Sequence, residues 1–291
     1  MRKPGDDDFP AFYRAADQAS LASQRRFLWV MRIRLGGLLV AAGGGALAGL
    51  QGFLPFGAWL ATIALVVAIA AEFYNLKVRP DRGWYEGRAA AESAKTLAWR
   101  YMVRGEKFET DGDVDAVFAR EIKALLTNLD HVPPADQHAQ ITELMREARS
   151  GSFDERKALY RRERLEDQRA WYASKARFNG NRFDVWTLVT IGLEFAGLLA
   201  AVMLVSGAIA FDALGVLSAL AAAFTAWAQA RQYQTLANAY GVTSQELASV
   251  IDQLDGVTSE DTWAAFVGQA EEAISREHTL WRASRGIKQT R

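Results

Sequence analysis

Four long apolar segments, grouped in two pairs, dominate the hydropathy pattern of the chain. The first pair covers about residues 35–71 and breaks near residues 54–55, and the second covers about residues 185–230 and turns near residues 211–212. Each segment is nearly free of charged residues and is close to the roughly 17–25 residues with which a helix crosses a hydrocarbon core. The pattern therefore predicts a polytopic membrane protein with four transmembrane helices in two hairpins.

Basic residues flank the hairpins on one side only. They are Arg25, Arg26, Arg32, Arg34, Lys77, Arg79, Arg82, Arg169, Lys175, Arg177, Arg182 and Arg231. The two hairpin turns contain neither Lys nor Arg. Because Lys and Arg are retained on the cytoplasmic side of a membrane, we expect both termini and the segment between the hairpins to be cytoplasmic, with the two hairpins in the same orientation.

The order of elements repeats once, with a period of about 150 residues. In each copy a basic helix precedes the hairpin, and a polar helix rich in Ala and aromatic residues follows it. This parallel duplication differs from the inverted repeats of many secondary transporters. We expect a first unit over residues 1–110, a cytoplasmic helical connector over 111–150, and a second unit with C-terminal cytoplasmic helices over 151–291.

The segments outside the hairpins show helical periodicity. Asp113 can cap a helix whose apolar positions recur every three or four residues, and Ser152 and Glu155 have the spacing of a capping box. The Asn-Gly-Asn sequence at residues 179–181 indicates a bend before the third transmembrane helix. No alternating strand pattern of useful length is present. The predicted fold class is therefore all-α, with a cytoplasmic helical bundle beside the membrane hairpins.

The composition argues against several classes of function. The 291 residues carry a formal net charge of zero, which gives no electrostatic case for a nucleic-acid partner. There is no cysteine, and His131, His138 and His278 lack neighbouring ligand residues. No glycine-rich phosphate loop stands between a strand and a helix. We therefore expect no metal, no cofactor and no enzymatic activity.

One acidic residue lies inside a predicted span. Glu194 is about ten residues into the third helix, roughly 15 Å along its axis, and so close to the middle of the membrane. A charge there costs roughly 2.5–3.5 kcal/mol, so Glu194 is expected to face protein or water. It is either a pore-lining or gating acid, or a protonated acid that is hydrogen-bonded to a neighbouring helix.

Polar residues also mark one face of the fourth helix. Ser218, Thr225 and Gln229 are seven and four residues apart, which places them on the same side. They either line a wetted path or take part in helix contacts inside the membrane. Glu72, at the inner end of the second helix, is a further pore candidate, with an interfacial charge as the alternative.

Small residues form a ridge along the first helix. Ala41, Gly45 and Gly49 are four residues apart, beside two further glycines. This small-xxx-small spacing predicts close helix packing. A flexible gating point is the alternative interpretation.

The residues around the two hairpins resemble the SLATT family of two-transmembrane effectors, which accompany bacterial nucleotide-signalling and ligand-sensing genes. After the first hairpin they are Trp84, Tyr85, Arg88, Glu92, Ser93, Lys95, Trp99 and Arg100. Around the second they are Trp171, Tyr172, Lys175, Phe178, Asn179, Gln232, Tyr233, Leu236, Ala237, Tyr240 and Leu247. The resemblance covers about residues 10–105 and 155–255, each half being similar to a different class of the family.

This resemblance implies a homo-oligomeric effector of bacterial anti-phage defence or conflict, which perturbs or permeabilises the inner (cytoplasmic) membrane on a cytoplasmic signal. The implied partners are the lipid bilayer, further copies of the chain, and either a separate cytoplasmic sensor protein or a nucleotide second messenger. The helix that carries Trp84, Arg88, Lys95 and Arg100 offers a face for an anionic ligand, with aromatic packing under the membrane as the alternative. A regulated channel or carrier for a small solute and a non-conducting membrane receptor or scaffold remain alternative functions.

Overall fold

The computed structural model describes residues 2–126, 132 and 140–284, and every regular element in these ranges is a helix. The all-α fold class is confirmed for this part of the chain. The chain divides into two compact units. The hairpin unit consists of residues 24–80 and 177–237, and the aromatic unit of residues 1–23, 81–176 and 238–291.

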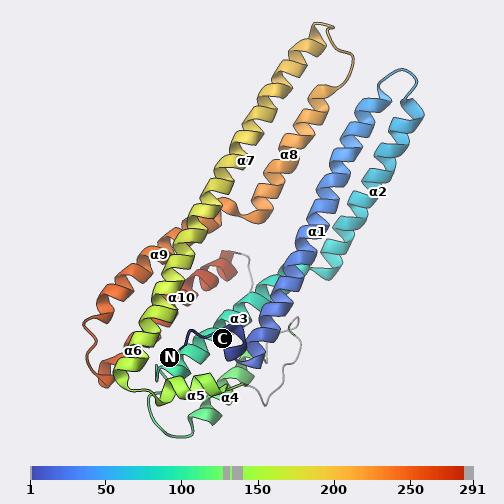
Figure 1. The fold of residues 1–291 in the computed structure, drawn as a ribbon. Coiled ribbons are helices and arrows are strands. Elements are labelled where there is room, and N and C mark those ends of the chain that lie inside the picture. Colours follow the sequence, from blue (N-terminus) through green and yellow to red (C-terminus); the bar gives the residue numbers. More distant parts are fainter. Residues whose placement is uncertain (1, 127–131, 133–139, 285–291) are drawn as a thin grey trace. The chain divides into compact units, whose positions relative to one another are not determined.

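The hairpin unit contains the predicted spans. They belong to α1 (Ala11–Ala48), α2 (Leu54–Val78), α7 (Asp167–Val205) and α8 (Ala213–Arg231). Each is part of a helix that is long and apolar enough to cross a membrane. Figure 1 shows α1 paired with α2, and α7 paired with α8, as antiparallel hairpins. The prediction of two helical hairpins with four candidate spans is therefore confirmed.

The first hairpin turn lies a few residues before the predicted break at residues 54–55. α1 ends at Ala48, and α2 begins at Leu54 with Pro55 in its first turn, where proline has no intrahelical N–H bond to lose. Gly52 in the turn has a φ of 84°, a conformation that glycine adopts without steric cost. The proline thus starts the second helix instead of separating the two.

Small residues let the helices of the first hairpin approach each other closely. A Cβ atom added to Gly44 would lie 2.8 Å from the backbone N of Ala61, and one added to Gly57 would overlap the backbone of Ala48. All the residues that α2 buries are Gly or Ala. Its exposed face consists mainly of Leu, Ile, Val, Phe and Trp, which suits contact with lipid.

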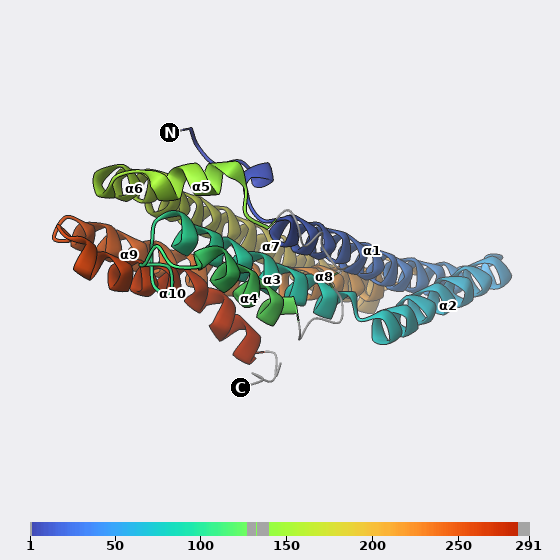
Figure 2. The same cartoon turned by 90° about the horizontal axis from the view of Figure 1, so that it is seen from below.

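The aromatic unit packs shorter helices around buried rings. Together with parts of α1 and α7 it contains η1 (Asp6–Asp8), α3 (Pro80–Met102), α4 (Val114–Leu126), α5 (Glu143–Ser150), α6 (Phe153–Tyr160), η3 (Arg161–Glu166), most of α9 (Tyr233–Leu254) and α10 (Glu260–Ser284). Figure 2 shows α9 and α10 side by side. Trp99, Tyr160 and Trp263 are buried, and their rings meet edge to face with centroids 6.0 and 5.8 Å apart.

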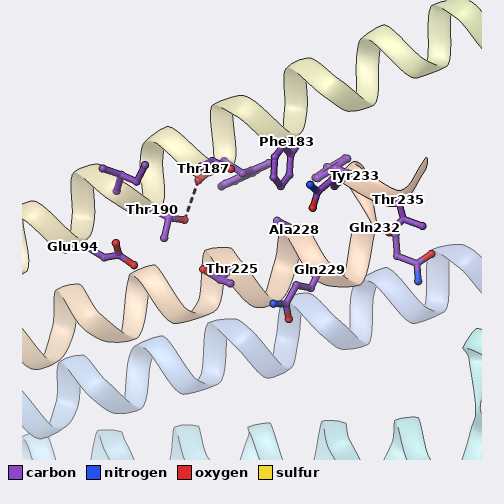
Figure 3. A pocket seen from close by; sticks show the side chains of 13 residues that line it. Phe183, Thr187, Thr190, Glu194, Thr225, Ala228, Gln229, Gln232, Tyr233 and Thr235 are labelled. Carbon is purple, nitrogen blue, oxygen red and sulfur yellow. Dashed lines mark hydrogen bonds between the residues drawn. The ribbon is translucent and has the colours of Figure 1, made fainter. Parts of the chain in front are cut away.

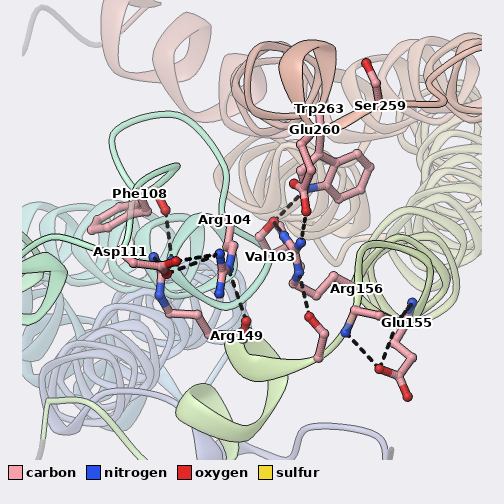
Figure 4. Close-up of polar contacts among 12 residues, drawn as sticks. Val103, Arg104, Phe108, Asp111, Arg149, Glu155, Arg156, Ser259, Glu260 and Trp263 are labelled. Atoms are coloured by element: carbon pink, nitrogen blue, oxygen red, sulfur yellow. Dashed lines mark hydrogen bonds and ion pairs between the residues drawn. The ribbon is translucent and has the colours of Figure 1, made fainter.

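Donors from three other helices hold the C-terminal end of α3. Figure 4 shows the two of them that bond to the carbonyl of Val103. Arg149 of α5 donates to the carbonyl of Tyr101 at 3.1 Å. Arg156 of α6 and Trp263 of α10 both donate to the carbonyl of Val103, at 3.1 and 2.5 Å. Because the last carbonyls of a helix lack intrahelical partners, these bonds stabilise the end of α3 and fix α5, α6 and α10 around it.

A buried ion pair joins η3 to α10. The side chains of Arg164 and Glu271 are 1% and 0% exposed, and Arg164 donates to both carboxylate oxygens, at 2.9 and 2.6 Å. Tyr160 and Thr96 also donate to Glu271, at 2.9 and 2.8 Å. Burial and the adjacent carboxylate hold the pKa of Tyr160 well above its usual value, so its hydroxyl remains a donor. η3 is a π-helical turn, which the sequence pattern did not predict.

α7 continues without interruption through residues 179–181, so the predicted bend there is wrong. Asn179 is buried, and its tertiary contacts outweigh the local preference of Asn-Gly-Asn for a turn. The predicted capping box is confirmed, because Ser152 and Glu155 each accept a bond from the backbone N–H of the other. Residues 127–131 and 133–139 of the predicted connector lie outside the described residues.

Candidate functional site

A pocket of about 530 Å³ opens between α7 and α8 in the hairpin unit (Figure 3). Its walls include polar residues from α7, α8 and the start of α9: Thr187, Thr190, Glu194, Thr225, Gln229 and Thr235. The pocket extends from the place where α8 meets α9, which we call the junction end of the hairpin, to Glu194 about halfway along the span. A polar cavity therefore occupies half of an otherwise apolar hairpin.

Two helix faces supply these polar walls. Thr187, Thr190 and Glu194 are three and four residues apart on α7, and Thr225 and Gln229 are four apart on α8, so each set shares one side of its helix. Figure 3 shows Thr190 and Glu194 pointing from α7 toward α8. The sequence analysis missed the two threonines of α7, although their spacing from Glu194 was a usable signal.

The hydroxyl groups of the pocket are already bonded to backbone. Thr190 donates to the carbonyl of Trp186 at 2.9 Å, and Thr225 donates to the carbonyl of Ala221 at 2.9 Å. Each hydroxyl proton is therefore occupied within its own helix. The free lone pairs of the two hydroxyl oxygens remain available as acceptors.

Glu194 is the one charged residue of the pocket wall. Its side chain is exposed, and within the described part of the chain no hydrogen bond or ion pair to it is present. Its depth in the span, roughly 15 Å from the start of the apolar segment, is near the middle of a hydrocarbon core. An unpaired acid at this depth requires water or another chain beside it.

The polar face of α8 is open in the single chain. The exposed residues of α8 are Ser218, Ala222, Thr225 and Gln229, three of them polar, and their spacing of four, three and four places them on one side of the helix. Ser218 lies on this face toward the hairpin turn and is not part of the pocket wall. We call these four residues the polar face of α8.

Glu72 lies apart from the pocket, in the first hairpin. Its Oε2 atom is 2.8 Å from Nε of Arg34, and both side chains are partly exposed. The pair joins α1 to α2. Of the five pore candidates, the structure thus brings Glu194, Thr225 and Gln229 together and leaves Ser218 and Glu72 outside the pocket.

Beyond Glu194, toward the turn, α7 and α8 meet through apolar residues. Gly197 and Ala200 of α7 are buried there. A Cβ atom added to Gly197 would lie 3.7 Å from Leu214 and 3.9 Å from Leu217 of α8, which is ordinary van der Waals contact. The polar cavity is therefore followed by an apolar contact between α7 and α8.

The predicted packing ridge of α1 is only partly in the hairpin contact. Ala41 is buried, whereas Gly45 and Gly49 are exposed. A Cβ atom on Gly45 would meet no heavy atom within 4 Å, while Gly37 and Gly44 lie against α2. Inside one chain, the close approach thus uses the face that contains Gly44. The ridge through Gly45 is left uncovered.

The proposed ligand face of α3 is used in contacts within the aromatic unit. Burial lowers the pKa of Lys95, as expected for an amine packed against aromatic rings. Trp84 stacks on Tyr85, and Arg88 lies over the ring of Trp171. Lys95 lies over the ring of Phe9, and Arg100 donates to the carbonyl of Gly268. These contacts accord with the packing interpretation of that face.

Within the described residues, no group of three or more His, Asp or Glu side chains could hold a metal ion. His131 and His138 lie outside the described residues, as does the side chain of His278. The prediction that concerns these histidines therefore stays a prediction.

Four apolar helices in two hairpins, one of which contains a polar cavity, define a polytopic membrane protein. Residues 10–157 match the family model of the SMODS and SLOG-associating 2TM effector domain 3, and residues 160–281 match that of domain 1. The chain belongs to the SLATT family, carries two of its domains in tandem, and is a membrane effector. No curated protein and no solved structure matches it. The first match includes residues 111–150, which the sequence analysis set apart as a connector.

Proposed function

We propose that copies of this chain assemble in the bacterial inner membrane, with both termini in the cytoplasm, and open an ion path along the polar face of α8 when a cytoplasmic signal arrives. The open polar face and its pocket carry this proposal. In this role the protein permeabilises the membrane during anti-phage defence or conflict. It does so without catalysing a reaction.

The contrast between the exposed surfaces of the two hairpins supports this assignment. From Leu54 to Phe73, the exposed residues of α2 are apolar except for Thr62 and Glu72. On α8, three of the four exposed residues are polar. A polar group left in hydrocarbon without a partner costs several kcal/mol. The first hairpin thus suits lipid contact, and the polar face of α8 suits protein or water.

Assembly follows from where the polar face lies. It is on the outside of the single chain, and four helices enclose too little space for a wide channel. Further copies can cover this face and surround a common path, in the way that closed rings arise from head-to-tail contacts. The uncovered ridge through Gly45 offers a second small-residue surface for contact between copies.

The apolar contact between α7 and α8 beyond Glu194 blocks the ion path in the resting state. Leu214 and Leu217 pack against Gly197 between Glu194 and the turn, so ions that enter at the junction end meet a dry barrier. Hydrophobic constrictions of this kind block conduction by excluding water. Opening requires α8 to move away from α7 beyond Glu194.

Continuous helices offer a route for the signal. The division between the two units falls inside α1, α7 and α9, so a rearrangement of the aromatic unit acts on helices that also form the hairpins. The aromatic unit is then the cytoplasmic part that a separate sensor protein or a nucleotide second messenger addresses.

Membrane potential in cells tests the proposal. Expression of the chain together with its trigger should abolish the potential. The double variant Thr225→Leu, Gln229→Leu should insert normally but leave the potential intact, because its α8 no longer presents a polar face. Thr62→Leu, an equivalent change on the exposed side of α2, is the matched control and should behave as the original chain. An intact potential under every trigger, or full activity of the double variant, contradicts the proposal.

A further inference from the structure

We propose that the pocket between α7 and α8 binds monovalent cations at the end that contains Glu194. This inference deepens the proposed function by naming the ion that enters the path. It rests on that function only for flux, since ion binding is measurable in a protein that conducts nothing. Three properties of the pocket lead to it: the kind of atom presented, the charge and the volume.

Oxygen acceptors line the Glu194 end of the pocket, whereas the amide groups of Gln229, Gln232 and Gln234, which both donate and accept, line its junction end. Because Thr190 and Thr225 give their protons to backbone carbonyls, their hydroxyl oxygens face the cavity as acceptors. The carboxylate of Glu194 adds two more oxygens. The indole Nε1 of Trp186, a donor on the same wall, is buried without solvent contact and presents no N–H to the cavity. The Glu194 end of the pocket therefore favours cations over anions.

The charge of the pocket points in the same direction. Among its thirteen lining residues Glu194 is the one acidic residue, and none is Lys, Arg or His. No neighbouring cation therefore neutralises the carboxylate. A bound cation would do so, and it would remove the cost of an unpaired acid at mid-membrane depth.

The volume and the single carboxylate favour monovalent ions. At about 530 Å³ the pocket has room for well over ten waters at ~30 Å³ each, so an ion enters with much of its hydration shell. Calcium sites usually combine six to eight oxygens, several of them from carboxylates. The weaker field of one carboxylate and two hydroxyls suits Na⁺ or K⁺.

Thermal unfolding of the full chain in lipid nanodiscs tests the site. At equal ionic strength, the unfolding temperature should be higher in NaCl or KCl than in N-methyl-D-glucamine chloride. Glu194→Gln, which keeps the shape of the side chain, should remove this difference. The pair Thr190→Val, Thr225→Val should reduce it.

Two control variants lie outside the pocket. Thr62→Val removes a hydroxyl that makes the same bond to its own helix, to the carbonyl of Ala58 at 2.8 Å. Glu72→Gln removes the acid that pairs with Arg34. Both should keep the full ion-dependent difference. A Glu194→Gln protein that keeps the full difference, or a wild-type protein that shows none, overturns the inference.

Ion selectivity in planar bilayers separates this inference from the proposed function. Current with a cation preference that falls several-fold in Glu194→Gln supports both. Current without cation preference overturns the cation site and leaves the permeabilising function standing. An absence of current under every trigger overturns the proposed function, while the nanodisc experiment still decides the site.

Discussion

Adjacent glycines of α1 provide a matched pair for testing how the first hairpin packs. A Cβ atom on Gly44 would lie 2.8 Å from the backbone N of Ala61 and 2.9 Å from the carbonyl O of Gly57, whereas one on Gly45 would meet nothing within 4 Å. Gly44→Ala should therefore destabilise the hairpin, and Gly45→Ala should not.

The geometry sets the size of the difference. Ordinary contact begins near 3.4 Å, so a methyl group at Gly44 must push the helices apart by at least about 0.6 Å, and overpacking of this kind costs about 1–3 kcal/mol. Both variants gain the same ~1 kcal/mol of helix propensity from replacing Gly with Ala. This gain cancels in the comparison, which leaves Gly45→Ala more stable by about 1–3 kcal/mol.

The assay is unfolding of the full chain by sodium dodecyl sulfate in mixed micelles, followed by circular dichroism. Gly44→Ala should unfold at a lower detergent fraction than the original chain, and Gly45→Ala at an equal or higher one. Equal midpoints for the two variants, or a lower midpoint for Gly45→Ala, refute the packing face described above. Gly45→Leu tests assembly. If this variant keeps an intact hairpin but forms fewer oligomers, Gly45 lies at a contact between copies.

Two further predictions concern the aromatic unit. Glu271→Gln should cost about 3–5 kcal/mol, because it leaves Arg164 buried without its counter-charge, and hydrogen exchange along α10 should rise accordingly. Arg164→Met combined with Glu271→Leu should restore part of the protection, because it removes both charges but leaves Tyr160 and Thr96 without their acceptor. Although partial burial raises the pKa of Asp115, bonds from Arg146 and Tyr101 lower it overall, below its usual 3.8. The stabilisation from Asp115 is therefore complete above that usual pKa and is lost as pH falls through the folded-state pKa. The protection factors of α4, which are corrected for the intrinsic pH dependence of exchange, should be constant above the usual pKa of Asp115 and fall as the pH drops below it, and Asp115→Asn should remove this pH dependence.

The sequence predicts the hairpins well because long apolar segments have few stable structures other than membrane helices. It locates the contacts inside them less well. Three consecutive glycines, at residues 43–45, offer three adjacent helix faces, and only the partner helix decides which one packs. The small-xxx-small spacing therefore predicted a ridge through Gly45, whereas the contact between α1 and α2 uses Gly44.

Long-range polar contacts leave no local signal at all. Arg164 and Glu271 are 107 residues apart, and in the sequence each resembles a solvent-exposed charge on a polar helix. The Asn-Gly-Asn sequence shows the opposite failure, since its local preference for a turn is overridden by the burial of Asn179. In the pocket, the spacing of Thr225 and Gln229 was recognised from α8 alone. The spacing of Thr187 and Thr190 from Glu194 was a signal in the sequence as well, but only the structure shows that this side of α7 faces α8.

Water access to the polar face of α8 tests the central claim most directly. The chain contains no cysteine, so single variants can be labelled without background by a charged, membrane-impermeant thiol reagent applied to membranes that contain the activated protein. Thr225→Cys should react and lose its ability to abolish the membrane potential. Ile63→Cys, on the exposed apolar side of α2, should stay unlabelled. An unreactive Thr225→Cys beside a reactive Ile63→Cys would contradict the account, because the wetted surface would then belong to the first hairpin.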